Sequence, residues 1–414
     1  MEEVLYTLAD KANIGTLVSV PVDFGILGTT TDDGAEVNYT VTAQENFQIH
    51  AQVHAGNAGS DLTVNYGQIS SIGNPLGSTI DLGFWAFNDE AFILSGSDSS
   101  SFSSTNTPQD WMQQNIHSIG CQPLRHLCMP ASHDAGMSQI NGHTALADDL
   151  DTLTQYSDIG GQLAAGFRYF DIRPVIHDGQ FYTGHYSDLA GSWQGGNGQS
   201  IASIISEVNA FLANNDELVI LDLSHAYDTD NGYPPLSQAQ TNALMQQLLG
   251  IQHRFAAPAG TSDLSQLKLN DFISSGASVI IIFDDSTLSP GDFSQNAFPG
   301  FYNNTQFSVY NSYADTPDVG TMVTDQLGKM AAQRRSPDSG LFLLSWTLTT
   351  LDPRDAAPTA HAALFQRLWP ALNKQTFPNF IMLDAIGYND NLNNRNVAAL
   401  SMAINQYFSP PCPA

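Results

Sequence analysis

The pattern of apolar and polar positions divides the chain near residue 95. Before that point, apolar residues at 47, 49, 51 and 53 alternate with polar residues at 48, 50, 52 and 54. Further alternating runs occur at 62–66 and 80–84, and Gly, Asn and Asp punctuate the segment at short intervals. A period of two is typical of strands with one buried face. We therefore expect residues 1–95 to form a small all-β sandwich that serves as an accessory domain.

A serine-rich segment follows this region. Residues 95–108 read SGSDSSSFSSTNTP, which is small, polar and prone to turns. Such a composition cannot bury apolar surface and is typical of linkers. We expect residues 96–115 to connect the β domain to a larger domain that spans residues 116–414.

In this larger domain, short apolar runs alternate with helical patterns. The strand candidates are 124–129, 167–172, 180–183, 218–223, 278–283, 307–310, 341–346 and 380–383. The helical candidates are 201–212, 241–249, 320–332, 361–372 and 397–407. Apolar strands separated by helices predict a parallel sheet buried on both faces, and eight of them predict a (β/α)8 TIM barrel. The barrel should be irregular, because no helix is predicted between the second and third strands.

The net charge of the chain limits the classes of molecule that it can bind. The chain has 13 basic and 41 acidic residues, so its net charge is −28. A field of this sign repels nucleic acid, and we expect no nucleic-acid partner. The start of the chain shows no signal peptide, and no apolar run reaches the roughly 18 residues of a membrane span. These features predict a soluble protein.

The three cysteines do not form the framework of a disulfide-rich domain. Cys121 and Cys128 are close enough in sequence to form a bridge. That pairing would leave Cys412, in a proline-rich tail, free.

Reactive side chains follow the predicted strands where each strand ends. The residues at these positions are His133, Asp134, Asp171, Arg173, His185, Asp222, Ser224, His225, Asp284, Asp285 and Asp384. The carboxyl ends of barrel strands meet on one face, where the active sites of such barrels lie. A single histidine at a strand end is more often structural than catalytic. Two histidines, an arginine and several carboxylates on one face indicate a catalytic site.

Several of these segments resemble a known family in sequence and in order. They are PASHDAG at 130–136, GFRYFDIR at 166–173, FYTGH at 181–185, ELVILDL at 217–223, FLLSWT at 342–347 and NFIMLD at 379–384. Together they resemble the X-type catalytic domain of phosphatidylinositol-specific phospholipase C, over roughly residues 120–390. The N-terminal β region lies outside the resemblance.

The resemblance implies a phosphodiesterase in which a neighbouring hydroxyl of the substrate attacks phosphorus and a cyclic phosphate forms. His133 would be the general base and His185 the general acid, since imidazole titrates near neutrality. Arg173 would hold the phosphate oxygens. Asp384 would orient His133, while Asp134 and Asp171 would support the phosphate or position Arg173.

The spacing of Asp171 and Arg173 bears on metal dependence. Metal-dependent relatives of this barrel carry two carboxylates two positions apart on the second strand, where both share one face. Here the second position is a guanidinium, which supplies positive charge itself and repels a divalent cation. We therefore expect no metal and no other cofactor.

Substrate contacts are less sharply defined. Ser224, His225, Asn311, Tyr313 and Trp346 are candidates for substrate binding. The segment 310–313 lies where bacterial relatives contact inositol, but Asn311 replaces an Asp, and Asp284 and Asp285 stand where a basic contact is expected. We expect a phospholipid or related phosphodiester as substrate, with phosphatidylinositol itself left open.

Location and partners follow from the resemblance and from analogy. The β domain would contact a membrane surface or a glycan, by analogy with other enzymes that carry such a domain. The family resemblance favours an extracellular location.

Two alternatives stay open. One is a metal-dependent phosphodiesterase of the same barrel, similar to glycerophosphodiester or sphingomyelinase-type enzymes. The other is a non-catalytic binding protein with a phospholipase C-like barrel.

Overall fold

The computed structural model describes residues 109–283, 288 and 299–388, short stretches between 397 and 412, and the backbone of six strands between residues 3 and 97. Asp284 and Asp285 lie outside the described residues, so their predicted place in the site is untested. The predicted helix at 397–407 is described only in part.

The N-terminal region consists of antiparallel strands. The four strands in the order β2-β1-β3-β6 form one sheet, and β4 pairs with β5 in another. Their bounds are β1 (Glu3–Asp10), β2 (Leu17–Asp23), β3 (Asn46–His54), β4 (Ser60–Asn65), β5 (Thr79–Trp85) and β6 (Ala91–Ser97). The period-two runs at 47–53, 62–66 and 80–84 thus coincide with strands. The packing of the two sheets into a sandwich stays a prediction, as do the domain boundaries.

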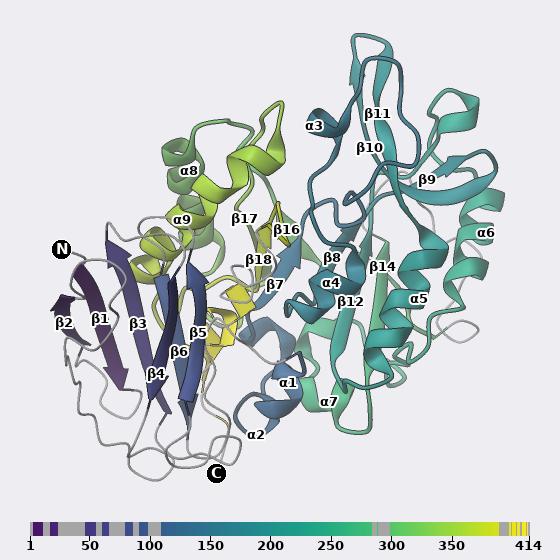
Figure 1. Ribbon diagram of the computed structural model, residues 1–414. Helices are drawn as coiled ribbons and strands as arrows, with labels where there is room; N and C mark the ends of the chain where they lie inside the picture. The colour runs from purple at the N-terminus through teal and green to yellow at the C-terminus, as the bar shows by residue number, and fades with distance from the viewer. Residues whose placement is uncertain are drawn as a thin grey trace.

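The larger region contains an eight-stranded parallel sheet in the order β15-β14-β12-β8-β7-β18-β17-β16. Its strands from β14 to β16 are labelled in Figure 1. The bounds are β7 (Met129–Ser132), β8 (Tyr169–Ile172), β12 (Leu218–Leu223), β14 (Ser278–Phe283), β15 (Phe301–Asn303), β16 (Val309–Asn311), β17 (Leu341–Ser345) and β18 (Phe380–Leu383). All seven pairings are parallel. The mixed α/β, barrel-like architecture agrees with the prediction.

One barrel strand was assigned wrongly and another was missed. Residues 180–183 belong to β10 (Gln180–Leu189), which forms a separate sheet with β9 (Pro174–His177), β11 (Ser192–Ser200) and β13 (Tyr227–Asp228). Much of β10 is exposed, as suits a hairpin that extends beyond the barrel (Figure 1). The position in the barrel is taken by β15, a strand of three residues that is too short to show a pattern.

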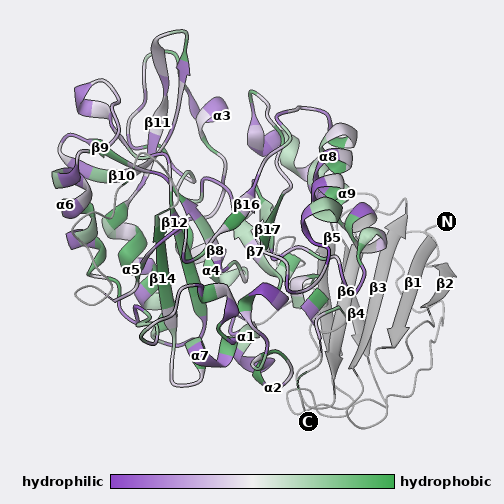
Figure 2. Cartoon of the chain, turned by 180° about the vertical axis from the view of Figure 1, so that it is seen from behind, coloured by the Kyte–Doolittle hydropathy of each residue, from purple (hydrophilic) through white to green (hydrophobic). Residues whose placement is uncertain are grey.

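Alternation along the parallel strands separates two apolar clusters. In β12, Leu218 and Ile220 face the barrel interior, where they join residues such as Met129 and Phe380. Val219, Leu221 and Leu223 face the helices outside the sheet. Both faces are buried, and β12 and β14 are hydrophobic along their length in Figure 2. The same parity determines which residues just past the strand ends point toward the barrel axis.

Five helices contribute buried residues to the outer apolar cluster: α4 (Ile159–Ala164), α5 (Ile201–Leu212), α6 (Gln238–Leu248), α8 (Val319–Gln333) and α9 (Pro353–Ala371). Buried residues of α1 (Trp111–Gln114), α2 (Ile116–Ile119) and α7 (Leu269–Ile273) join the inner cluster instead. The short helix α3 (Asp149–Thr152) lies in the segment between β7 and β8. In α5 the buried residues Ile204, Val208 and Phe211 recur at helical spacing, and Ser200 caps the first turn by accepting from the Ser203 N–H at 3.1 Å. Capping and a single apolar face explain why this segment is a helix. Within the described residues, no helix is long and apolar enough to cross a membrane.

A disulfide and a buried hydrogen bond connect distant segments at the amino end of the barrel. Cys121 forms a disulfide with Cys412, and Cys128 is a buried free thiol, so the bridge between Cys121 and Cys128 that the sequence left open does not form. Cys128 directly precedes β7 and is fully buried. The disulfide holds the C-terminal tail beside α2, where Cys412 contacts the carbonyl of Ser118. Trp111, in the segment predicted as linker, is fully buried and donates to the carbonyl of Gly166 at 3.0 Å. The packed region therefore begins by Trp111.

Candidate active site

The carboxyl ends of β7, β8, β12 and β18 bring the predicted reactive residues together. Parity from the interior residues Ala131, Tyr169 and Met382 places His133, Arg173 and Asp384 on the inner side of their strand ends. Asp134 has a left-handed backbone with φ of 44°, a conformation that L-residues other than glycine seldom adopt outside functional or turn positions. Its N–H donates to Asp171 Oδ2 at 3.1 Å, which fixes this turn against β8.

His133 is held by a carboxylate from the adjacent strand. Its Nδ1 lies 2.8 Å from Asp384 Oδ1. Burial disfavours the imidazolium, but the attraction of Asp384 and this hydrogen bond outweigh it and raise the pKa of His133 above 6.5. The contact orients Nδ1 as the donor and leaves Nε2 as the nitrogen that can accept a proton.

Arg173 is the centre of the cluster. Its Nη2 lies 2.9 Å from His133 Nε2, its Nη1 donates to Asp134 Oδ2 at 3.2 Å, and its Nε donates to Asp171 Oδ2 at 3.0 Å. Burial opposes the charged forms of Asp134 and Asp171, but the guanidinium holds the pKa of both carboxyls below the usual range. The two carboxylates in turn raise the pKa of Arg173. One fixed cation thus lies between two anions and the ring of His133.

His185 reaches the same cluster from β10. Its Nδ1 is 2.9 Å from Asp134 Oδ2, an ion-pair contact whose angles fall outside those of a good hydrogen bond. Asp134 therefore links His185 to Arg173. Both histidine side chains keep about a quarter of their surface exposed, at 24% for His133 and 23% for His185, so solvent or substrate can reach them.

Ser224 and His225 extend the cluster past the end of β12. Ser224 is buried and its hydroxyl donates to Asp171 Oδ1 at 2.8 Å. His225 is exposed, with φ of 46°, and its Nδ1 lies 2.8 Å from the Ser224 hydroxyl. Both residues thus lie beside the cluster, and substrate contact stays a prediction for them.

The other predicted substrate contacts are less close. Asn311 ends β16 and is exposed, and Tyr313 is 61% exposed on the loop that follows. Among the described residues, neither side chain forms a hydrogen bond or ion pair with the cluster. Trp346 faces outward from β17, is 1% exposed and donates its indole N–H to the carbonyl of Ala360 on α9 at 2.6 Å. Trp346 is therefore a packing residue, and its prediction as a substrate contact was wrong.

Sequence reasoning did not single out Gln155. This residue is fully buried on the loop between α3 and α4, and it bonds the backbone of the segments that carry His133 and Asp384. Gln155 lies in a loop, where the flanking residues show no helical or strand periodicity, so a single sequence does not indicate that its side chain is buried beside the site.

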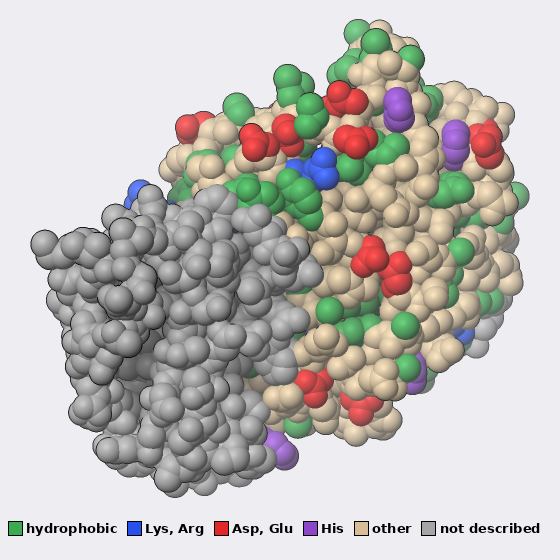
Figure 3. Space-filling model, in the orientation of Figure 1, with side chains coloured by type: hydrophobic (Ala, Val, Ile, Leu, Met, Phe, Trp, Pro, Cys, Tyr) green, Lys and Arg blue, Asp and Glu red, His purple; other side chains and the backbone are tan. Residues whose placement is uncertain are grey.

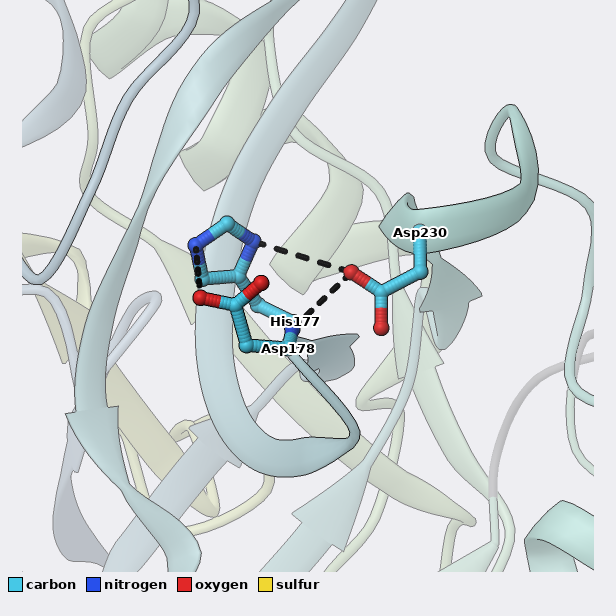
Figure 4. A group of neighbouring side chains, drawn as sticks. All are labelled: His177, Asp178 and Asp230. Atoms are coloured by element: carbon cyan, nitrogen blue, oxygen red, sulfur yellow. Dashed lines mark hydrogen bonds and ion pairs between the residues drawn. The ribbon is translucent and has the colours of Figure 1, made fainter.

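A separate group has side chains of the type that bind metal ions. His177 and Asp178 lie at the turn between β9 and β10, and Asp230, in the short 3-10 helix Thr229–Asn231, lies against this turn (Figure 4). His177 Nδ1 is 3.9 Å from Asp230, whereas its Nε2 is 3.9 Å from Asp178, so the carboxylates approach opposite nitrogens of one ring. Asp230 also accepts the N–H groups of Asp178 and Gly179, each at 2.9 Å. Stabilising this turn accounts for the group.

Exposed apolar side chains surround the end of the barrel that carries the cluster. Four leucines there are between 56% and 87% exposed. Together with three tyrosines, the large exposed hydrophobic residues of the described part are Leu146, Leu150, Tyr156, Leu189, Tyr310, Tyr313 and Leu351. All lie on β16 or on segments that follow the carboxyl ends of barrel strands. In Figure 3, hydrophobic and acidic side chains gather along this upper edge.

Part of the chain is similar in sequence to curated proteins that are named for a PI-PLC X domain. No family model matches the chain. It is 31% identical over 147 residues to "PI-PLC X domain-containing protein 3" of Bos taurus and 30% identical to that of Homo sapiens. These alignments cover 28% of this chain and 42% of the relatives, so the chain spans less than half the length of the curated relatives it matches.

Solved structures extend the likeness over most of the chain. The phosphatidylinositol-specific phospholipase C of Listeria monocytogenes superposes with a TM-score of 0.52 at 18% identity, covering 70% of this chain and 98% of that one. A mutant of the Staphylococcus aureus enzyme gives 0.50 at 15% identity, with 71% and 98% covered. At such identities, the structures show the shared fold. The chain is thus similar in sequence, over 147 residues, to proteins named for a PI-PLC X domain, and it shares its fold with bacterial phosphatidylinositol-specific phospholipases C.

Proposed function

We propose that this protein is a metal-independent phosphodiesterase. It cleaves a phospholipid whose head group carries a hydroxyl next to the phosphate ester, giving a cyclic phosphate and a free alcohol. The observation that carries the proposal is the linked set His133–Arg173–Asp134–His185, in which one guanidinium and one carboxylate connect two partly exposed imidazoles. An in-line displacement at phosphorus needs a base, an acid and positive charge at the phosphate, and these four residues supply all three.

Each side chain then has a defined task. His133 Nε2 takes the proton from the attacking hydroxyl, and Asp384 stabilises the imidazolium that results. Arg173 turns one of its N–H groups from His133 to the non-bridging oxygens. His185 gives a proton to the leaving oxygen from Nε2, while its Nδ1 faces Asp134. The bond between phosphorus and the oxygen of the leaving alcohol breaks as the bond between phosphorus and the attacking oxygen forms.

Arg173 is also the reason for proposing that no metal takes part. Its guanidinium already neutralises Asp134 and Asp171, whose carboxylates are otherwise the natural oxygen ligands at this point of the barrel. A divalent cation would have to displace a fixed positive charge that lies within 3.2 Å of both.

The exposed leucines and tyrosines at the carboxyl end of the barrel, called the apolar rim from here on, support a lipid as substrate. Separate leucines on separate segments, such as Leu146, Leu189 and Leu351, suit shallow insertion between lipid head groups. Acidic residues next to exposed leucines in the sequence, such as Asp149 beside Leu150 and Asp352 beside Leu351, disfavour an anionic surface. We therefore propose that the rim contacts a phospholipid surface without net negative charge. The proposed membrane or glycan contact of the β domain would be additional.

Phosphorus NMR tests this function. Phospholipids in mixed micelles and soluble phosphodiesters are incubated with the protein in EDTA and, separately, in Mg²⁺, Ca²⁺ or Zn²⁺. We expect a cyclic phosphate signal in EDTA that is absent with His133→Asn. Activity that requires a metal would favour the metal-dependent alternative. No cleavage of any substrate would favour the binding-protein alternative.

A further inference from the structure

The loop between α3 and α4 contacts the turn that follows β18, close to the proposed base His133. Ala385 N donates to the carbonyl of Thr154 at 2.7 Å, and Ser157 N donates to the carbonyl of Ile386 at 2.8 Å. Gln155 lies between these contacts and is completely buried. The loop before α4 therefore runs along the turn that follows β18.

The carboxamide of Gln155 is fully engaged. Its Nε2 donates to the carbonyl of His133 at 2.5 Å and to that of Leu383 at 3.3 Å, while its Oε1 accepts the Ile386 N–H at 2.9 Å. All three partners are backbone groups in the two segments that carry His133 and Asp384. One side chain thus cross-links the strand end of the base to the strand end of its carboxylate.

We propose that Gln155 is a positioning residue, which sets the contact between the His133 imidazole and the Asp384 carboxylate by tying their backbones together. The proposal rests on the proposed function, because it assigns Gln155 a part in the work of the base. His361 on α9 supports the opposite side, with its Nε2 at 3.0 Å from the Asp384 carbonyl. Burial lowers the pKa of His361 to about 4, so this ring is neutral and can donate.

The charges around His133 determine the expected effect. The ring faces Asp384 after β18, Arg173 and Asp171 at the end of β8, and Asp134 beside it. Gln155 bonds only the His133 and β18 segments, so its loss loosens the contact with Asp384 and leaves Arg173 in place. Asp384 favours the imidazolium, hence the pKa of His133 should fall when this contact loosens.

Gln326 provides a matched control. It is also fully buried, its Nε2 donates to the carbonyl of Ser312 at 2.8 Å, and its Oε1 accepts the Ser345 N–H at 2.9 Å. It therefore links the ends of β16 and β17, where neither the proposed base nor the acid is located. Replacing Gln326 removes an equivalent amide from the same end of the barrel.

The test compares Gln155→Met with Gln326→Met by NMR titration of the His133 imidazole, assigned with His133→Asn. We expect Gln155→Met to lower the pKa of His133, to move the acid limb of the pH–rate profile the same way, and to reduce kcat by about ten- to a hundred-fold with KM little changed. Gln326→Met should leave the titration and the limb unchanged.

Two results would overturn the proposal: a wild-type titration in Gln155→Met, or an equal shift in Gln326→Met. Gln155→Asn, which keeps the amide but cannot span both segments, is the second variant if Gln155→Met does not fold. The titration needs no turnover, so an absence of phosphodiester cleavage would remove the proposed function and still leave the positioning role decided by NMR.

Discussion

Two arginines of one strand segment show how the ends of the barrel differ. Arg168 precedes β8, is fully buried with Glu217 at 2.8 Å, and donates to backbone carbonyls including those of Leu163 and Phe167. Arg173 follows β8 and pairs with two carboxylates, but its side chain keeps 16% of its surface exposed beside two histidines. Arginine therefore stabilises the fold at the amino end, whereas at the carboxyl end it provides a positive charge that solvent or substrate can reach.

The contrast extends to the rest of each end. At the amino end, Arg334 is buried and bonds the carbonyls of Phe377 and Ser339, and the disulfide Cys121–Cys412 joins distant segments. At the carboxyl end, left-handed backbone occurs just past three strands, at Asp134, His225 and Ala385. Polar groups that are fully satisfied contribute stability, whereas accessible and strained groups are typical of functional sites.

Replacing each arginine by lysine gives the largest expected difference. Arg173→Lys keeps the charge but loses the fork, and should lower kcat by about 10²- to 10³-fold with a small change in stability. Arg168→Lys should leave kcat unchanged and lower the free energy of unfolding by about 2–4 kcal/mol, because buried acceptors lose their donors. Steady-state kinetics and urea denaturation measure the two effects. A loss of kcat in Arg168→Lys well below its melting temperature would contradict the comparison.

Removing the disulfide should affect only stability. The bridge joins residues 291 positions apart, so Cys412→Ser should reduce the free energy of unfolding by about 2–5 kcal/mol through the entropy of the unfolded chain. Denaturant curves with and without dithiothreitol check this. Reduction should destabilise the wild type and have no further effect on Cys412→Ser. Equal stability of wild type and variant would show that the tail does not close the amino end.

The pH dependence tests the electrostatics of the carboxyl end. The pKa of His133 is raised above 6.5 in the folded protein, and a base must be unprotonated, so kcat/KM should rise with pH to a midpoint above 6.5. Asp384→Asn removes the main stabilising attraction and should move this midpoint to lower pH while reducing activity. A pH–rate profile of each protein provides the measurement. An unmoved midpoint would mean that another group controls the acid limb.

The same pKa shift has a consequence for stability. The imidazolium of His133 is favoured in the folded state, so its contribution is present below pH 6.5 and is lost as the pH rises through the folded value. Asp134 and Asp171 have lowered pKa values and contribute in the opposite sense. Their contribution is present above the unfolded pKa near 3.8 and is lost as the pH falls.

The apolar rim should give the smallest effect. Replacing Leu146, Leu189 and Leu351 together by Ser should reduce cleavage of a hydroxyl-bearing phospholipid carried in zwitterionic vesicles several-fold, since about three partly inserted side chains are lost. Hydrolysis of a soluble phosphodiester should stay at the wild-type rate. Vesicle sedimentation and kinetics on both substrates measure this. Equal losses on both substrates would place these leucines in the site rather than on a lipid contact.

Part of this arrangement follows from the sequence, because alternation along buried parallel strands is a strict rule. His133, Arg173 and Asp384 share the parity of interior residues in their own strands, which predicts that they converge. Trp346 has the opposite parity to Leu343 and Ser345, so the same rule, applied to β17, would have placed it outside. Cys412 and Gln155 depend on contacts between segments far apart in the chain, and no local pattern encodes such contacts. The three-residue β15 is too short to show alternation at all.

The most direct test of the acid and base roles uses the leaving group. A phosphodiester with a p-nitrophenyl leaving group needs no proton from the enzyme, whereas its alkyl counterpart does. We predict that His185→Asn loses about 10²- to 10⁴-fold in kcat on the alkyl ester and stays within about tenfold of the wild type on the p-nitrophenyl ester, while His133→Asn loses activity on both. Equal losses of His185→Asn on the two esters would contradict the account.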